Sequence, residues 1–141
     1  MSYKILIIDD KEHTMSKKIL VIDDEKHLLK MLEMELKFEE YKVMTALDGD
    51  RGLGLVREFR PDLIVTDCMM PNITGIDVLE KLREDPSSRD IPVILLSNKW
   101  DIEDTLQSFS KVMFMRKPFE MAELCDNIKL MLEASESGGT S

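Results

Sequence analysis

Five short apolar runs, each followed by a stretch with helical spacing of apolar residues, constrain the fold of this chain more than any other feature. Most runs are rich in branched side chains, which suits strands buried on both faces of a sheet. The runs cover residues 19–22, 42–46, 63–65, 91–96 and 112–115, and the helical patterns cover residues 25–38, about 53–59, 75–84, 101–109 and 121–132. This alternation predicts an α/β fold: a doubly wound, five-stranded parallel sheet with helices on both faces and the flavodoxin-like strand order 2-1-3-4-5.

Polar residues stand where four of these runs end. They are Asp23-Asp24, the single carboxylate Asp67, Ser97, and Arg116-Lys117-Pro118. Because the carboxyl ends of parallel strands meet at one edge of a sheet, we expect these groups to converge there, with the acidic pair beside Asp67 at the switch point. Taken alone, Asp67 is about as well explained as a turn cap. Its expected neighbours favour a functional site.

Three carboxylates at one edge repel one another unless a cation neutralises them. Oxygen ligands with open positions suit Mg²⁺, which keeps waters and accepts a phosphate oxygen. Zinc is disfavoured there, because His13 and His27 lie outside the cluster and neither cysteine shows ligand spacing. The set fits phosphoryl transfer, in which Asp67 attacks, Lys117 neutralises charge and Ser97 donates to a phosphoryl oxygen. The expected product is an acyl phosphate.

As an ordered set, these residues resemble the response-regulator receiver domain of two-component signalling, in particular chemotaxis-regulator-like receivers. The resemblance covers roughly residues 16–134 and rests on Asp23-Asp24, Asp67 followed by Pro71 and Gly75, Ser97, and Lys117-Pro118-Phe119. It implies that the central aspartate accepts a phosphoryl group from a histidine kinase or a phosphotransfer protein. It also implies a signalling switch, with self-catalysed phosphorylation and dephosphorylation only, and not an enzyme with a separate substrate.

The resemblance further assigns the Mg²⁺ ligands. It implies that Asp24, Asp67 and the backbone carbonyl of Met69 bind the ion directly, while Asp23 helps through water. The peptide bond between Lys117 and Pro118 is expected to be cis.

Two positions carry the implied switch, and the sequence departs from the family pattern around them. Ser97 and Phe114 are implied to move together on phosphorylation and to change a partner-binding surface. Ser97 replaces the commoner Thr but keeps the hydroxyl, whereas Phe114 lacks the hydroxyl of the frequent Tyr. Asn98 stands where a small residue is usual, and Ser110-Lys111 replaces a Gly-Ala turn. The fourth helix region is about two residues short, so the output partner stays open.

Three other functions compete with the switch. A pseudo-receiver, acting as a phosphorylation-independent interaction module, is favoured by the altered fourth helix and disfavoured by the complete acidic set. An aspartyl-phosphatase-type enzyme needs a second aspartate two residues after the nucleophile, where this chain has Met69. A nucleotide-binding Rossmann domain needs a G-x-G-x-x-G after the first strand, which is missing here.

Charge and composition limit the partners. The chain has 28 acidic and 19 basic residues and a formal charge of −9, which argues against nucleic-acid binding by this chain itself. Its two cysteines are too few for a disulfide framework. No apolar run approaches the roughly 20 residues of a membrane span, and the apolar start is too short for a signal peptide. These features predict a soluble cytoplasmic protein.

The start of the chain contains an internal repeat. Residues 2–15 align with residues 16–29 at eight identities in fourteen positions, so a strand and its acidic end occur twice. Only the second copy runs directly into a helix, with Asp24 available as its cap. Placing the first copy in the sheet requires some fifteen residues to loop out, at a cost of about 1–2 kcal/mol. We therefore expect the second copy in the sheet.

This reading divides the chain into three parts: an extension over residues 1–15, a receiver domain over 16–134, and a flexible polar tail over 135–141. Two outcomes stay open for the extension. Its apolar, strand-prone run either docks on a sheet edge or on a neighbouring molecule, giving a dimer, or it remains a flexible arm.

Overall fold

A five-stranded parallel sheet forms the centre of the molecule, and its strand order is β2-β1-β3-β4-β5. The computed structural model describes residues 17–98 and 103–138. The strands are β1 Lys18–Ile22, β2 Lys42–Ala46, β3 Leu63–Asp67, β4 Val93–Ser97 and β5 Val112–Arg116. The helices are α2 Lys26–Phe38, α3 Gly49–Phe59, α4 Gly75–Glu84, α5 Glu103–Leu106 and α6 Met121–Gly138. The predicted fold class and strand order are confirmed.

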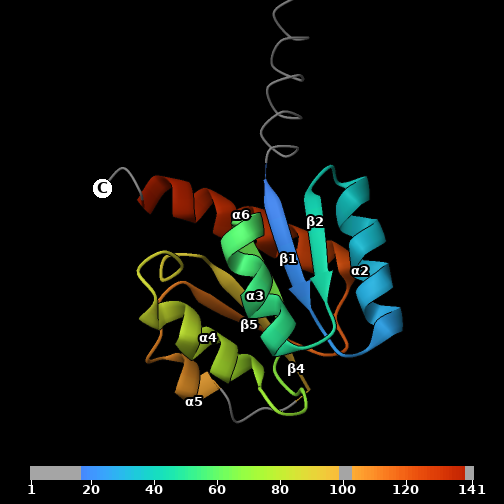
Figure 1. Cartoon of the computed structure of the whole chain (residues 1–141). Coiled ribbons are helices and arrows are strands. Elements are labelled where there is room, and N and C mark those ends of the chain that lie inside the picture. The colour runs from blue at the N-terminus through green and yellow to red at the C-terminus, as the bar shows by residue number, and fades with distance from the viewer. Residues whose placement is uncertain (1–16, 99–102, 139–141) are drawn as a thin grey trace, which may run out of the picture.

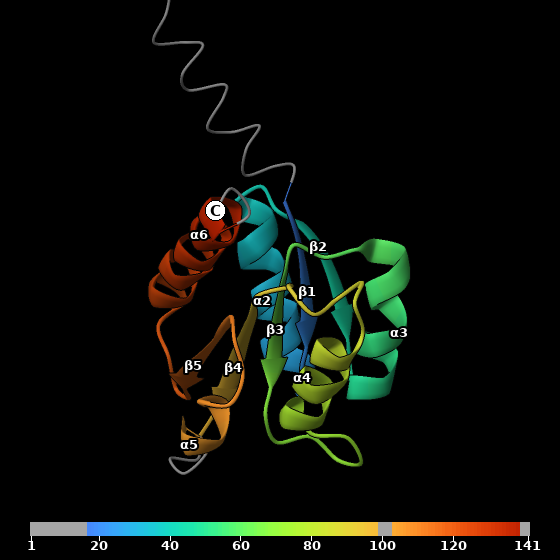
Figure 2. The same ribbon diagram turned by 90° about the vertical axis from the view of Figure 1, so that its left-hand side faces the viewer.

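Helices cover both faces of the sheet, with α2 and α6 on one side and α3 and α4 on the other (Figures 1 and 2). The central strand β3 shows why. Leu63 and Val65 pack into the core under α2 and α6, whereas Ile64 between them packs into the core on the opposite face. A strand buried on both faces reads as a continuous apolar run, which is the pattern that the sequence showed.

The second copy of the repeat supplies the first strand. Residues 18–22 form β1, which pairs in parallel with β2 on one side and β3 on the other. Every side chain from Ile19 to Ile22 is fully buried. The prediction that this copy enters the sheet is therefore confirmed. Whether the first copy docks or remains a flexible arm concerns residues 1–15, which lie outside the described residues.

Two helices differ from their expected lengths. Helix α6 continues to Gly138, whereas the apolar pattern ended at Leu132, so the expected boundary of the tail at residue 135 falls inside a helix. Lys17, just before β1, forms a 2.7 Å ion pair with Glu136 in this extra stretch. Helix α5 is a single turn in the described part of the 101–109 pattern. Within residues 17–98 and 103–138, no helix is long and apolar enough to cross a bilayer.

The turn before β5 is held by a side chain that the sequence did not single out. The guanidinium of Arg83, on α4, donates to the backbone carbonyls of Ser110, Lys111 and Ile91 at 2.9–3.1 Å. Lys111 adopts a left-handed conformation with φ of 54°, which costs a non-glycine residue about 1 kcal/mol or more. Arg83 thus stabilises the turn that stands where the family pattern has Gly-Ala.

Replacing Arg83 with Ala is expected to lower the free energy of unfolding by about 2–4 kcal/mol, since hydrogen bonds from a charged donor are worth about 1.5–3 kcal/mol each and their losses are not additive. Urea denaturation measures this change. Lys81→Ala, at an exposed position of the same helix, is the matched control and is expected to stay within about 0.5 kcal/mol of wild type. Equal stability of the two variants would show that Arg83 does not hold the turn.

Candidate functional site

Three carboxylates meet at the carboxyl ends of β1 and β3. The parallel register pairs Ile22 with Thr66. The residues that follow them in the chain, Asp23 and Asp67, therefore lie side by side. One oxygen from each of Asp23, Asp24 and Asp67 lies within 4.8 Å of the others. Asp23 is fully buried, Asp67 is 6% exposed and Asp24 is exposed. The sheet places them at the point where the chain reverses its strand order, as predicted.

Lys117 brings a positive charge into this cluster from the end of β5. Its Nζ lies 3.1 Å from Asp23 Oδ2 and 3.2 Å from Asp67 Oδ1. The ion pair with Asp67 confirms the expected contact, and the ion pair with Asp23 was not anticipated. The backbone N–H of Lys117 donates to the carbonyl of Ser97 at 2.9 Å, which ties the ends of β4 and β5 together. The Lys117-Pro118 peptide bond is cis, as expected.

Asp23 and Asp24 have different roles, and the expected helix cap is wrong. The cap position of α2 is Glu25, whose side chain makes no capping hydrogen bond to the described part of the chain. Asp23 Oδ1 instead accepts the backbone N–H of Glu25 at 2.8 Å, while its Oδ2 accepts from Lys117. Both oxygens of Asp23 are therefore engaged by the protein. Asp24 stands exposed at the mouth of the site, where a carboxylate can meet a cation from solution.

The charges shift the pKa values of the central pair. Burial raises the pKa of Asp67 above its ordinary 3.8, and neighbouring Asp23 and Asp24 raise it too; Lys117 lowers it, but the net shift is upward. Burial lowers the pKa of Lys117, yet Asp23 and Asp67 outweigh burial and the net shift is upward. Asp67 is thus a carboxylate whose negative charge lacks full compensation, which favours binding of a further cation.

This shift predicts how stability depends on pH without a metal. The folded state holds the proton of Asp67 more tightly than the unfolded state, so the ionisation of Asp67 destabilises the fold as pH rises above 3.8. The free energy of unfolding of Asp67→Asn minus that of wild type is therefore expected to grow with pH and to level off above the raised pKa. Denaturation in chelator between mildly acidic and neutral pH measures it. A difference that shrinks with pH would contradict the shift.

A glycine lets the loop after β3 close tightly under the site. The N–H of Gly75 donates to the carbonyl of Cys68 at 2.9 Å. A Cβ at this position would lie 2.5 Å from the carbonyl oxygen of Asp67 and 2.8 Å from the Cα of Cys68. Thr74 and Asp77 then start α4 with a capping box, each side chain accepting the other residue's backbone N–H. These contacts thus hold the backbone of the loop that directly follows Asp67.

The remaining predicted residues, Ser97, Phe114 and Met69, lie at different distances from the acidic cluster. Ser97 ends β4 and is buried, one strand away from Asp67. Phe114 lies earlier in β5, paired with Leu95, and is half-buried against the core on the α3 and α4 face. It lines a shallow cleft with Leu106, Phe109 and others, and is not part of the acidic cluster. Met69 follows the cluster in the loop and is exposed; its role as a carbonyl ligand stays a prediction.

The donor set fits Mg²⁺. Each acidic residue offers a carboxylate oxygen, the ligand that this ion prefers, and the exposed position of Asp24 leaves room for the waters that it retains. The ammonium of Lys117 neutralises only part of the charge of three carboxylates. The three carboxylates that could hold the ion are the acidic residues that the sequence predicted at this edge of the sheet.

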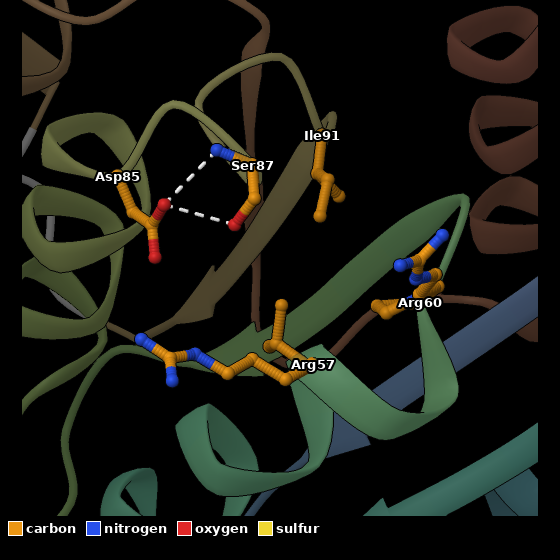
Figure 3. A pocket seen from close by; sticks show the side chains of 7 residues that line it. Arg57, Arg60, Asp85, Ser87 and Ile91 are labelled. Atoms are coloured by element: carbon orange, nitrogen blue, oxygen red, sulfur yellow. Dashed lines mark hydrogen bonds between the residues drawn. The ribbon is translucent and has the colours of Figure 1, made fainter.

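A second concavity lies at the opposite edge of the sheet and has a different character. It is a cleft of about 560 Å³ between the end of α3 and the loop that leads into β4, lined by Arg57, Arg60, Asp85, Ser87, Ile91 and neighbours (Figure 3). The carboxylate of Asp85 is already bonded to the backbone N–H and hydroxyl of Ser87, at 3.0 and 2.8 Å. This cleft shares no residue with the acidic cluster.

Comparisons with known proteins agree with the resemblance that the sequence motifs showed. A family model for the response regulator receiver domain matches residues 19–129. The chain is 32% identical over 135 residues to the DNA-binding dual master transcriptional regulator RpaA of Synechocystis, covering 94% of this chain and 50% of that protein. It is 38% identical over 122 residues to Response regulator PleD of Caulobacter vibrioides, covering 85% of this chain and 24% of that protein. The chain thus spans half or less of the length of these two relatives.

Solved structures give the same result for the fold. Chemotaxis protein CheY4 of Vibrio cholerae superposes with a TM-score of 0.76 at 25% identity, over 82% of this chain and 98% of that one. A response regulator receiver domain protein from Clostridium thermocellum also reaches a TM-score of 0.76, at 27% identity, over 85% of this chain and 97% of that one.

Proposed function

Because this chain belongs to the response regulator receiver domain family of two-component signal transduction, we propose that it is a phosphoacceptor switch in which Asp67 receives the phosphoryl group. The observation that carries this proposal is the pair of contacts from the Lys117 ammonium to Asp23 and Asp67 inside a three-carboxylate cluster. That arrangement joins a nucleophile to the charges that phosphoryl transfer requires.

The donor is proposed to be a phosphohistidine of a histidine kinase or a phosphotransfer protein. A carboxylate oxygen of Asp67 attacks phosphorus, a new P–O bond forms, and the P–N bond to the imidazole breaks. The imidazole leaves and takes up a proton from solvent, so Asp67 ends as an acyl phosphate. Asp67 is the residue for this step because both oxygens of Asp23 are held by Glu25 N–H and Lys117.

The other residues stabilise the transferred group. Bound Mg²⁺ supplies positive charge that offsets the carboxylates and the phosphoryl oxygens. Asp24, Asp67 and the carbonyl of Met69 are the proposed direct ligands, and Asp23 is proposed to help through a bound water. Lys117 keeps its charge close to Asp67 throughout, and the hydroxyl of buried Ser97 is proposed to donate to a phosphoryl oxygen.

Ser97 and Phe114 are proposed to carry the signal away from the site. Ser97 pairs with Arg116 across β4 and β5, and Phe114 lies two residues earlier on β5 beside a surface cleft. A shift of Ser97 toward a phosphoryl group opens space at that end of β4 into which Phe114 can turn. Phe114 has no hydroxyl, so its inward position is favoured by apolar burial alone.

We also propose what the receiver acts on once it is phosphorylated. We assign residues 16–134 to the receiver, with its last helix continuing to Gly138. One relative is by its name a DNA-binding transcriptional regulator; by analogy, the output here is a partner or a domain that reads the receiver surface.

Labelling with a small phosphodonor tests the proposal. In Mg²⁺ the intact chain is expected to gain the mass of one phosphate, and in chelator it is expected to gain none. Asp24→Ala is expected to reduce labelling by at least about tenfold, because Asp24 is the exposed carboxylate at the mouth of the site. Asp104→Asn, at an exposed position on α5, is the control. Absence of an adduct in Mg²⁺ would favour a pseudo-receiver that binds partners without phosphorylation.

A further inference from the structure

The strand β2 leaves one edge of the sheet open. It pairs with β1 along its inner side, and no other strand of the described chain pairs with it (Figure 1). The N–H of Lys42 donates to the carbonyl of Lys17, so Lys42 points its backbone groups toward β1. Because this direction alternates along a strand, Val43 and Thr45 point their N–H and C=O groups outward. An open edge of this kind is a template for a further strand.

A largely apolar cleft of about 480 Å³ lies beside this edge, between β2 and α3. Its lining consists of Thr45, Ala46, Leu47, Arg51, Gly54 and Leu55. A Cβ on Gly54 would meet no atom within 4 Å, although alanine stabilises a helix interior by about 1 kcal/mol relative to glycine. Met44, on the same face of β2 as Ala46, is 37% exposed. The described chain thus leaves apolar surface uncovered next to an open strand edge.

The first copy of the repeat has the composition of a strand that fits this edge. Residues 4–8 read Lys-Ile-Leu-Ile-Ile, whereas β1 reads Lys-Ile-Leu-Val-Ile and already pairs with the inner side of β2. A strand of this composition carries apolar side chains on both faces. At the edge of the sheet it would meet half-buried Val43 on the α2 face and exposed Met44 on the α3 face.

The length of chain before β1 limits how residues 4–8 can reach this edge. Lys17, where the chain enters the sheet, lies beside the start of β2. The nine steps from Ile8 to Lys17 span at most about 30 Å, and the position outside β2 is two strand spacings, about 10 Å, from β1. A parallel strand needs a crossover of roughly a dozen residues or more, whereas residues 9–16 number eight. An antiparallel strand ends at the start of β2, so the short link suffices.

Charge favours the same orientation. In an antiparallel strand, Asp9 and Asp10 would follow residues 4–8 at the start of β2, beside Lys42. Lys42 is exposed, and its ammonium forms no ion pair with any residue that the structure describes. The parallel orientation would carry both aspartates to the other end of β2, near Asp48, whose partner Arg51 is already engaged.

We propose that residues 4–8 bind the outer edge of β2 in the same chain, as a sixth and antiparallel strand that covers the cleft between β2 and α3. Parallel sheets of this class often carry one antiparallel edge strand. Asp9 and Asp10 then lie at the opposite end of the sheet from Asp67, so they do not compete with Asp23 and Asp24 for a metal ion. The short link gives the strand an effective concentration of about millimolar, which favours its own chain over a second molecule.

Amide hydrogen exchange of the full chain, followed residue by residue by NMR, tests the proposal. The outward N–H groups of Val43 and Thr45 are expected to be protected in wild type. The N–H of Met44, which points toward β1, is the internal reference and is expected to be protected in every variant that is folded. Exchange of Val43 and Thr45 at the rate of an unstructured peptide, with Met44 protected, would overturn the proposal.

A pair of variants shows whether residues 4–8 provide this protection. Ile5→Asp/Ile7→Asp is expected to speed exchange at Val43 by at least about tenfold. His13→Asp/Thr14→Asp adds the same charge within the link and is the matched control, expected to exchange like wild type. Equal protection of Val43 in the two variants would show that another segment covers the edge.

Two further measurements check the direction of the strand and the chain that it comes from. Nuclear Overhauser contacts are expected to join Ile8 to the start of β2 and Lys4 to its end; the reverse order would refute the antiparallel orientation. Light scattering is expected to give the mass of one chain. A dimer that Ile5→Asp/Ile7→Asp dissociates would show that the strand binds a second copy instead, and would overturn the assignment to the same chain.

Discussion

Asp67→Asn is expected to abolish the phosphate adduct, reducing labelling by at least about 10³-fold, and to leave the fold intact. An amide is not a nucleophile at phosphorus, and neither of the other two carboxylates of the described cluster is placed to replace Asp67. Asp23 is held by Lys117 and by the N–H of Glu25, and Asp24 is exposed on the rim of the cluster. The measurement is intact mass after incubation with a phosphodonor and Mg²⁺.

The fold of this variant should be at least as stable as wild type in chelator. Removing one of three crowded carboxylates relieves the repulsion that raises the pKa of Asp67. Asp50→Asn, at an exposed position on α3, is the matched control and should label normally. Stable phosphorylation of Asp67→Asn at the same site, or unfolding of the variant, would refute this assignment.

Lys117→Ala is expected to lower the free energy of unfolding as well as to impair signalling. The ammonium contacts two carboxylates that are almost completely buried, at 3.1 and 3.2 Å. Removing one partner of a buried ion pair leaves an uncompensated charge and typically costs about 3–5 kcal/mol. We expect a loss of about 3 kcal/mol in the free energy of unfolding at neutral pH in chelator.

Mg²⁺ should restore part of this loss, because the variant keeps all three carboxylates and lacks only the ammonium. Lowering the pH should also restore part of it, because protonation of Asp67 removes one of the uncompensated charges. After phosphorylation, Lys117→Ala is expected to bind its output partner poorly. Denaturation with and without Mg²⁺ gives the first two results, and Lys81→Ala serves as control. A variant as stable as wild type in chelator would show that the ion pairs contribute nothing.

Much of the fold could be predicted because the sequence patterns are strong where burial is complete. Leu63, Ile64 and Val65 are all fully buried, and their continuous apolar run identified the central strand. The predicted helix over residues 75–84 matches α4, whose limits are set by Gly75 at its start and by the Asp85-Pro86 loop. The site followed from the fold, since parallel strands carry their terminal polar residues to one edge.

Other features depend on contacts between distant residues, which no local pattern reports. The end of α6 was placed early because Ser135 and Glu136 read as tail, yet Glu136 pairs with Lys17 across the sheet edge. Asp24 was expected to cap α2, but the helix begins one residue later, with Glu25 at the cap position and its N–H donating to Asp23. Arg83 binds carbonyls up to 28 residues away.

The position of the phosphate is the most direct test of the central claim. The wild-type chain, labelled with a phosphodonor in Mg²⁺, would be digested and its peptides mapped by mass. The account predicts one phosphate, labile to hydroxylamine, on the peptide that contains Asp67 and on no other. A phosphate on a peptide without Asp67, or a phosphate resistant to hydroxylamine, would contradict it.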